Sequence, residues 1–130
     1  DFAAIDYLQK IPLPERKGFN EASLIGHVVE TIKTAAEELA IPIFMGCQVT
    51  RAHSQRYDHK PHLSDLRKSG EIEEKCNQVV FLFREAMVNE NVKTDVVEVY
   101  AEKNTLGPCE QARLLHRAGE FRFDNAKFGE

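Results

Sequence analysis

Two short apolar runs separated by a longer segment constrain the fold of this 130-residue chain more than any other feature. A short apolar run at residues 2–5 ends in Asp6, a second run at residues 43–47 ends in Gln48, and a longer segment with a different period separates them. Continuous apolar runs of this length are typical of buried strands in parallel sheets. The order of strand, helix and strand therefore predicts an α/β unit with a parallel sheet.

The segment between the two runs predicts one amphipathic helix. Residues 10–20 contain two Pro and one Gly and indicate a loop, and Asn20 is a suitable N-cap with Glu21 at the positive end of the helix dipole. Apolar residues then recur with helical spacing, which predicts one buried face. These residues are Ile25, Val28, Val29, Ile32, Ala35, Ala36 and Leu39.

The second half of the chain predicts further strands in a single domain without a long linker. Ser69 can cap a short helix over residues 71–76, and residues 79–83 form a third apolar run. Strands are also expected at 96–100, 111–116 and 120–123, with Ala118-Gly119 as a tight hairpin link. The expected fold is α/β, with a mostly parallel sheet, flanking helices and a C-terminal antiparallel hairpin extension.

Composition excludes several functional classes. Lys and Arg number 17 and Asp and Glu 21, so the net charge of −4 excludes a uniformly basic nucleic-acid binder but permits a local basic patch. No apolar run approaches the roughly 20 residues of a membrane span. The three Cys are far apart and form no C-x-x-C pair, which favours a reducing compartment, and we expect the cytoplasm.

Asp6 and Gln48 are the first candidate site residues, because ligands of parallel α/β sheets bind beyond the carboxyl ends of the strands. An apolar strand that ends in Asp is the Walker B arrangement, in which the carboxylate holds nucleotide-bound Mg²⁺, usually through water. Gln48 could orient a water molecule or sense a phosphate. The alternatives are a turn or cap residue for Asp6 and a solvated side chain for Gln48. No G-x-x-x-x-G-K-[ST] motif occurs, so the residues alone give half of an ATP site.

The polar stretch at residues 49–69 is the second candidate site. It carries five basic residues against two acidic ones, together with three of the five His, and Ser69-Gly70 offers free backbone N–H groups. This composition suits a phosphodiester backbone, and a solvated surface loop is the alternative. A zinc site is a further alternative, with irregular spacing; it would use His53, Asp58, His59, His62 and Cys47. Apolar neighbours should raise the pKa of Cys47, which favours an inert buried thiol.

Five segments occur in an order that is more specific than any one of them. They are Asp6-Tyr7-Leu8-Gln9, Gln48-Val49-Thr50-Arg51, the run PHLSDLRKSGEIE at residues 61–73, VVFLFR at 79–84, and Lys103 ahead of Gly107-Pro108. Together they resemble the C-terminal half of the RecA-like motor domain of DnaB-type replicative helicases over nearly the whole chain. The most specific part is residues 63–73, since the family carries a near-identical S-D-L-R-x-S-G-x-I-E run.

The resemblance implies a partial RecA-like fold in which residues 1–130 are the C-terminal portion of a motor domain whose Walker A half is missing from this sequence. Asp6 matches the Walker B aspartate that positions Mg²⁺. Gln48 matches the glutamine that senses the γ-phosphate and links nucleotide state to the DNA loop. Lys103 matches the lysine that reaches the nucleotide of the neighbouring subunit. The loop positions that hold single-stranded DNA phosphates in the channel of a hexameric ring correspond to Arg67, Lys68 and Gly70.

The resemblance also implies ligands and partners. ATP and Mg²⁺ would serve the intact protein, which would form a hexameric ring on single-stranded DNA, with primase and a helicase loader as candidates for further partners. Three positions depart from the family pattern. Thr105 stands where the family has an arginine finger, Lys68 where it usually has Glu, and residues 58–61 read D-H-K-P in place of a more basic D-K-R-P. These differences suggest a divergent version of the family.

The predicted function is therefore that of a fragment of a hexameric, ATP-dependent, 5′-to-3′ replicative DNA helicase, inactive by itself without a phosphate-binding loop. An ATPase of the RadA or KaiC kind is one alternative, because it shares the features of Asp6 and Lys103. A non-catalytic DNA-binding or interaction module derived from a RecA-like ATPase is another, favoured by Thr105 and by the missing Walker A motif. A fragment should leave strand edges and apolar helix surface uncovered.

Overall fold

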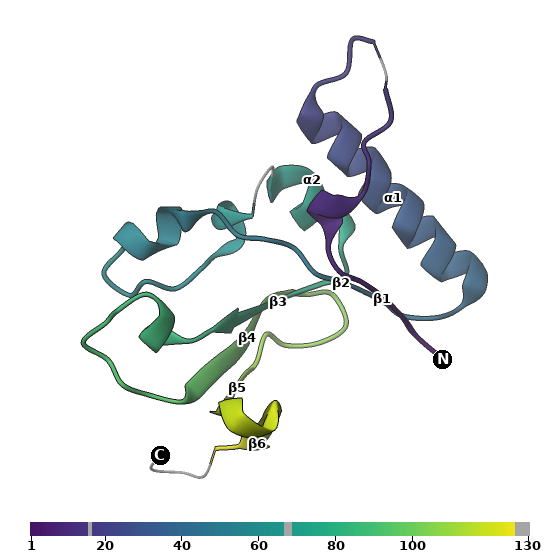
Figure 1. Cartoon of the computed structure of the whole chain (residues 1–130). Coiled ribbons are helices and arrows are strands. Elements are labelled where there is room, and N and C mark those ends of the chain that lie inside the picture. The colour runs from purple at the N-terminus through teal and green to yellow at the C-terminus, as the bar shows by residue number, and fades with distance from the viewer. Residues whose placement is uncertain (16, 67–68, 127–130) are drawn as a thin grey trace. The chain divides into compact units, whose positions relative to one another are not determined.

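The structure, a computed structural model, describes residues 1–15, 17–66 and 69–126, which form two compact units (Figure 1). Unit 1 comprises Asp1–Thr50 and Leu63–Cys76, and unit 2 comprises Arg51–His62 and the chain from Asn77 onward. The chain passes from one unit to the other at residues 50–51, 62–63 and 76–77. Each unit contains its own sheet, so the units are described separately.

Unit 1 is built on a parallel pair of strands. β1 (Ala3–Ile5) pairs with β2 (Ile43–Met45) in a register that places Ile5 opposite Met45. α1 (Glu21–Leu39) connects the two strands and packs against β2 and against α2 (Ser69–Lys75). The strand, helix and strand order that the sequence predicts is confirmed. The short helix runs over Ser69–Lys75, so its predicted start at Glu71 was two residues too late, and Ser69 is its first residue and not its cap.

The predicted boundaries of α1 are confirmed in atomic terms. Asn20 is the N-cap, and its side-chain oxygen accepts a hydrogen bond from the Ser23 backbone N–H at 2.9 Å. Ala40 ends the helix in the left-handed conformation, with φ of 52°. Gly26 permits the close approach of α2, because a Cβ at that position would lie 2.3 Å from Glu71 Oε2. The buried residues of the helix are Ile25, Gly26, Val28 and Val29.

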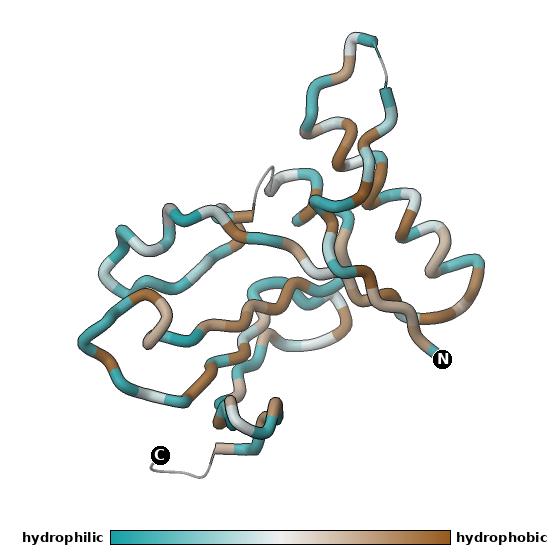
Figure 2. The backbone as a smooth tube through the Cα atoms, in the orientation of Figure 1, coloured by the Kyte–Doolittle hydropathy of each residue, from teal (hydrophilic) through white to brown (hydrophobic). Residues whose placement is uncertain are grey.

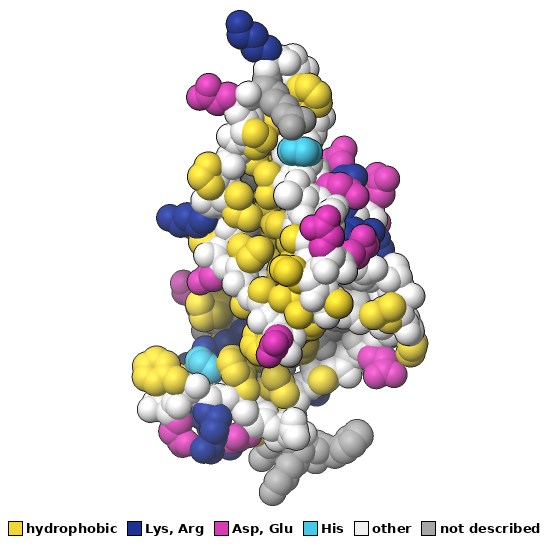
Figure 3. Space-filling model, turned by 90° about the vertical axis from the view of Figure 1, so that its right-hand side faces the viewer, with side chains coloured by type: hydrophobic (Ala, Val, Ile, Leu, Met, Phe, Trp, Pro, Cys, Tyr) yellow, Lys and Arg dark blue, Asp and Glu magenta, His cyan; other side chains and the backbone are white. Residues whose placement is uncertain are grey.

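Part of the apolar surface of unit 1 is exposed. Phe2 on the chain before β1 and Phe44 on β2 pack edge to face at 5.7 Å yet are 68% and 63% exposed. Leu39 at the end of α1 is 64% exposed, so its predicted place on the buried face of the helix was wrong. Apolar side chains are visible on the side of the molecule drawn in Figure 3. Among the described residues, no helix combines the length and apolar character needed to cross a bilayer.

Unit 2 is built on an antiparallel sheet with the strand order β3, β4, β5 and β6. The strands are β3 (Gln78–Phe83), β4 (Val96–Asn104), β5 (Gln111–Arg117) and β6 (Arg122–Asn125). Figure 2 shows hydrophobic residues running along β3, whose Phe81 and Phe83 are buried on one face of the strand. The predicted combination of a parallel sheet with a C-terminal antiparallel extension is confirmed.

Two details of the strand prediction differ from the structure. The third apolar run, β3, pairs with β4 in the antiparallel sheet, because an apolar run reports burial and not the direction of its partner. The predicted two-residue link at Ala118-Gly119 was wrong. Arg117 pairs with Arg122, so four residues form the connection, and Phe121 takes the left-handed conformation there (φ 50°).

We expect the buried face of α1 to dominate the stability of unit 1. Ile25 is 6% exposed, and Ile25→Ala should lower the free energy of unfolding by about 2–5 kcal/mol, since it removes buried methylenes and leaves a cavity. Leu39→Ala on the same helix is the matched control, and it should change that free energy by less than about 0.5 kcal/mol. Urea denaturation followed by circular dichroism measures both values. Equal losses for the two variants would contradict the assignment of the core.

Candidate functional site

The parallel register of unit 1 brings Asp6 and the residues that lead to Gln48 to one edge of the sheet. β1 ends at Ile5 and β2 ends at Met45, and these two residues are paired. Beyond them the Gly46 N–H donates to the Ile5 carbonyl at 2.9 Å, and the Leu8 N–H donates to the Gly46 carbonyl at 2.9 Å. Asp6 directly follows β1 and Gln48 lies three residues after the end of β2, so both follow neighbouring strands at the same edge. The predicted second strand at residues 43–47 was too long, because β2 ends at Met45.

Gly46 allows the two chain segments to pass close to each other at this edge. A Cβ on Gly46 would lie 3.3 Å from Tyr7 Cβ and 3.8 Å from Asp6 Oδ1. The Asp6 carboxylate therefore lies beside the backbone that leads into Gln48. Both Asp6 and Gln48 are exposed, so each side chain is accessible to a ligand in solution.

Gln9 links the two segments, and the sequence reasoning did not single it out. It lies in the short 3₁₀ helix η1 (Leu8–Lys10). Its side-chain carbonyl accepts a hydrogen bond from the Gln48 backbone N–H at 3.2 Å, and its amide NH₂ donates to the Gln48 carbonyl at 3.4 Å. The same NH₂ lies 3.2 Å from Cys47 Sγ. Its place in the Asp6-Tyr7-Leu8-Gln9 segment, which is part of the family resemblance, was the signal that could have drawn attention to it.

Cys47 has the character that its apolar neighbours predict. Burial raises the pKa of its thiol above the ordinary value, while the hydrogen bond from Gln9 opposes that shift. A thiol with a raised pKa is mostly protonated at neutral pH and is a poor nucleophile. The thiol therefore has a packing role beside Gln48.

The donors at this edge fit a magnesium ion that is delivered on a nucleotide. Mg²⁺ prefers oxygen ligands, retains several waters, and is usually held in proteins by one or two carboxylates together with phosphate oxygens. Asp6 supplies one exposed carboxylate of this kind. Across the described parts of the chain, no three His, Cys, Asp or Glu side chains are grouped closely enough to hold a metal ion by themselves. The set therefore suits a shared nucleotide–metal site and not a closed zinc site.

The basic stretch that follows Gln48 divides between the two units. Within unit 1, Val49 forms an isolated antiparallel bridge with Leu66, and the Thr50 N–H donates to the Asp65 carbonyl at 2.8 Å. Asp65 is 2% exposed. Gly70 lies in the first turn of α2 and is exposed, with no atom within 4 Å of a Cβ built on it. Arg67 and Lys68, the other two predicted DNA contacts, lie outside the described residues.

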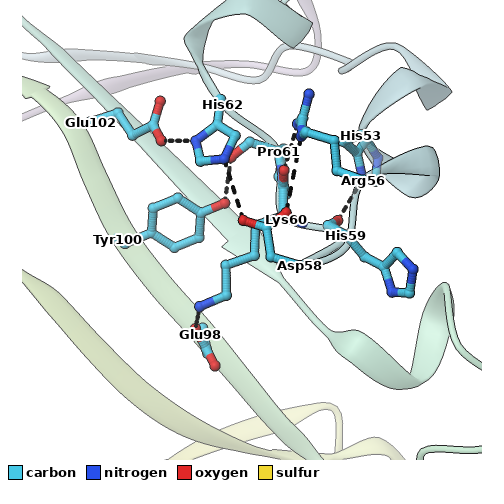
Figure 4. A network of polar contacts seen from close by, with 10 residues as sticks. All are labelled: His53, Arg56, Asp58, His59, Lys60, Pro61, His62, Glu98, Tyr100 and Glu102. Carbon is cyan, nitrogen blue, oxygen red and sulfur yellow. Dashed lines mark hydrogen bonds and ion pairs between the residues drawn. The ribbon is translucent and has the colours of Figure 1, made fainter.

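Within unit 2, the segment at residues 51–62 is fixed to β4 by a polar network (Figure 4). Lys60 forms an ion pair with Glu98, and the Tyr100 hydroxyl donates to the Pro61 carbonyl at 2.6 Å. His62 bonds the Glu102 carboxylate through Nδ1. Glu98, Tyr100 and Glu102 alternate along one face of β4, with period two, and meet Lys60, Pro61 and His62 in turn.

The sequence reasoning missed this network. It treated residues 49–69 as a polar stretch without a period and offered a solvated loop as the alternative. The signal was present in β4, where two acids at a spacing of four residues flank Tyr100 on one strand face. The zinc alternative is also not supported, because among the described residues no three His, Cys, Asp or Glu side chains are grouped closely enough to hold a metal ion. His62 contacts two carboxylates, Glu102 and Asp58, the latter at 3.6 Å from Nε2.

The charges in this network shift the pKa values of its members. The hydrogen bond with Glu102 raises the pKa of His62 above its ordinary value, and the nearby Asp58 carboxylate acts in the same direction. The Lys60 backbone N–H, which donates to Asp58, lowers the pKa of that carboxyl group. Burial raises the pKa of Tyr100, which keeps the hydroxyl protonated as a donor to Pro61.

Lys103 and Thr105 lie in unit 2, at the end of β4, and Asp6 and Gln48 lie in unit 1. Lys103 is paired with Val79 across a bulge between β3 and β4. Thr105 follows the strand, is exposed, and donates its backbone N–H to the Asn77 carbonyl at 3.0 Å. Both residues therefore sit where β4 leaves the sheet, at a position fixed by backbone pairing.

Comparison with known proteins adds independent information. The chain matches the sequence family described as "DnaB-like helicase C terminal domain" over residues 1–125. It is 36% identical over 124 residues to the replicative DNA helicase DnaB of Pasteurella multocida, which covers 93% of this chain and 26% of that protein. The DnaB of Geobacillus stearothermophilus is 32% identical over 111 residues, with 85% and 24% covered. The chain thus spans about a quarter of the length of the curated relatives it matches.

Solved structures agree with the sequence comparison. One, titled "The Structure Of A DnaB-Like Replicative Helicase And Its Interactions With Primase", aligns with a TM-score of 0.86 and 30% identity, covering 95% of this chain and 30% of that chain. A second, an ATPase domain, aligns with the same TM-score and identity and covers 95% and 44%. The predicted partial RecA-like α/β fold is confirmed by this likeness.

The His62–Glu102 pair should make the stability of unit 2 depend on pH. Because the folded-state pKa of His62 is raised above 6.5, the pair stabilises the fold fully below that pH, and its contribution is lost as pH rises through the raised value. The His62 side chain is 42% exposed, so screening limits the contribution to less than about 1 kcal/mol.

We therefore expect His62→Ala to lower the melting temperature by a few degrees between about pH 5 and 6.5 and by much less near about pH 9. Glu102→Gln should give the same pH dependence, and Lys93→Ala serves as an exposed control. Thermal unfolding at each pH measures the effect. A decrease of the same size at both ends of the range would contradict the role of the charged pair.

Proposed function

From the premise that this chain belongs to the DnaB-like helicase C-terminal domain family, we propose that it is part of the motor of a hexameric, ATP-dependent replicative DNA helicase that translocates on single-stranded DNA. On this proposal, residues 1–130 are the C-terminal portion of a RecA-like motor domain. The phosphate-binding loop would belong to another part of the same protein. The family match over residues 1–125 is the observation that carries the proposal.

The geometry of unit 1 supports the proposed ATP site. Asp6 and Gln48 occupy the carboxyl edge of a parallel sheet, where ligands of open α/β folds bind. Mg²⁺ that arrives with ATP neutralises the charge that develops on the phosphates during transfer. Asp6 would hold that ion through water, as its exposed carboxylate permits. Gln48 would respond to the terminal phosphate, because it is exposed and follows β2 at the same edge.

The contacts beyond Gln48 support a link from the ATP site to the DNA loop. Val49 bridges Leu66, and Thr50 bonds Asp65, so a displacement of Gln48 reaches the residue before Arg67 through two backbone contacts. Arg67, Lys68 and Gly70 would hold DNA phosphates by charge and by backbone N–H groups. A loop that grips phosphates and moves with a strand-end sensor converts hydrolysis into translocation. Lys103 would reach the nucleotide of a neighbouring subunit in the ring.

The partners follow from the same proposal. One structural relative is described together with its interactions with primase, and we propose primase as a partner of the protein that contains this chain, with a helicase loader as a further candidate. Such a protein would act on chromosomal or phage DNA in the cytoplasm.

Thr105 favours one competing function, a non-catalytic DNA-binding or interaction module. An arginine finger is typically worth about 10³ to 10⁵ in rate, and Thr cannot supply its fixed positive charge. On this alternative the protein would bind single-stranded DNA without hydrolysing ATP. The ATPase of RadA or KaiC type that shares Asp6 and Lys103 is not supported, since the family match is to the helicase.

The proposal is tested on the gene product that contains this sequence. An antibody raised to the chain should detect a polypeptide several times larger than 14.8 kDa in the source cells. The purified protein should hydrolyse ATP, faster with single-stranded DNA. Asp6→Asn should lower that rate by about 10- to 100-fold through weaker Mg²⁺ positioning, and Glu90→Gln in an exposed turn is the control. DNA binding without any ATP hydrolysis would refute the motor and leave the module.

A second prediction concerns the DNA loop. Arg67→Ala should weaken binding of single-stranded DNA and reduce the slope of affinity against salt concentration by about one phosphate contact. Arg122→Ala, an exposed arginine on β6, is the control for a general loss of charge. Fluorescence anisotropy at several salt concentrations measures both quantities. An unchanged affinity and slope for Arg67→Ala would show that the loop is not the DNA site.

A further inference from the structure

The hydrogen bonds of Gln9 at the sheet edge give this residue a role that the proposed function does not include. We propose that Gln9 is a positioning residue, which fixes the backbone of Gln48 to the segment that follows Asp6. Through this connection, the state of the nucleotide at Asp6 and the position of the DNA loop change together. The inference rests on the proposed function and deepens it.

The Gln9 side chain bonds both backbone groups of Gln48. Its carbonyl accepts from the Gln48 N–H at 3.2 Å, while its NH₂ donates to the Gln48 carbonyl at 3.4 Å and approaches Cys47 Sγ at 3.2 Å. One side chain thus engages both polar backbone groups of a single residue. The amide can do this because it carries both an acceptor and donors, whereas a carboxylate has no donor and an ammonium group has no acceptor. Gln48 itself is exposed.

The η1 helix, from which Gln9 extends, is itself bonded to the chain that follows β2. Leu8, the residue before Gln9, is 3% exposed, and its N–H donates to the Gly46 carbonyl at 2.9 Å. The η1 helix is therefore fixed to both strands of the parallel pair at the point where they end. Because η1 is held in place close to Asp6, the bonds of Gln9 fix the position of the Gln48 backbone relative to Asp6.

The two residues after Gln48 bond the chain that leads to the predicted DNA loop. The next residue, Val49, bridges Leu66, and the Thr50 N–H bonds the Asp65 carbonyl at 2.8 Å. A continuous series of hydrogen-bonded contacts therefore runs within unit 1 from the Asp6 segment, through Gln9 and Gln48, to the start of the predicted DNA loop. Removal of the Gln9 amide would leave the backbone bonds at Gly46 in place but would break the direct connection to Gln48.

The test uses three variants. Gln9→Met keeps the length of the side chain and removes its hydrogen bonds. Gln9→Glu keeps the acceptor for the Gln48 N–H and removes the donors. Gln111→Met, an exposed glutamine on β5, is the matched control and should leave every readout unchanged. Circular dichroism and thermal unfolding establish that each variant folds.

The first readout is independent of any helicase activity. Hydrogen exchange of the Gln48 amide, measured by nuclear magnetic resonance, should be roughly five- to tenfold faster in Gln9→Met, since one net hydrogen bond is lost. Gln9→Glu should retain the protection. Unchanged exchange in Gln9→Met overturns the inference, because the Gln48 N–H would then have no dependence on Gln9.

The second readout is the kinetics of the gene product. Gln9→Met should lower the DNA-stimulated kcat by about ten- to a hundredfold, as expected for misplacement of a reacting group by about 1 Å, with a much smaller change in KM for ATP. A stimulated kcat equal to wild type overturns this inference alone and leaves the proposed function standing. A wild-type protein without any DNA-stimulated hydrolysis overturns both.

Discussion

The parallel pairing of β1 with β2 is the interaction on which the other features of unit 1 depend. It places Ile5 opposite Met45, so the chain leaves both strands at one edge, and Asp6 comes to lie beside Gly46 and Gln48. Parallel strands need a crossover connection, and α1 supplies it while packing against β2 and α2. A shift of this register by one residue would turn the side chains of one strand to the opposite face of the sheet and change which of them meet at this edge.

Two kinds of polar connection hold chain segments that lie outside the strands, one kind in each unit. At the sheet edge the connection is neutral, because Gln9 bonds backbone groups of Gln48, so it is insensitive to salt and to pH. In unit 2 the connection is charged, because Lys60 and His62 pair with acids of β4. Screening and protonation therefore act on the second connection and not on the first.

Much of the fold could be predicted, and the errors share a cause. Asn20 and the helical spacing of apolar residues gave α1 correctly, because capping and amphipathic periodicity are local properties. The direction of β3 and the four-residue connection before Arg122 could not be read in the same way. Strand direction and register depend on which residues meet across the sheet, and those residues are distant in sequence.

The sequence by itself determined the α/β order, the family, and the identity of Asp6 and Gln48 as neighbouring strand-end residues, since each follows from local patterns and short motifs. Only the tertiary structure decided that Gln9 bonds Gln48 and that Lys60 and His62 meet Glu98 and Glu102. These partners are separated by 38 to 40 residues, and a polar side chain carries no local signal of its partner. The meeting is set by strand pairing and by the path of the connecting chain, which exist only once the chain has folded.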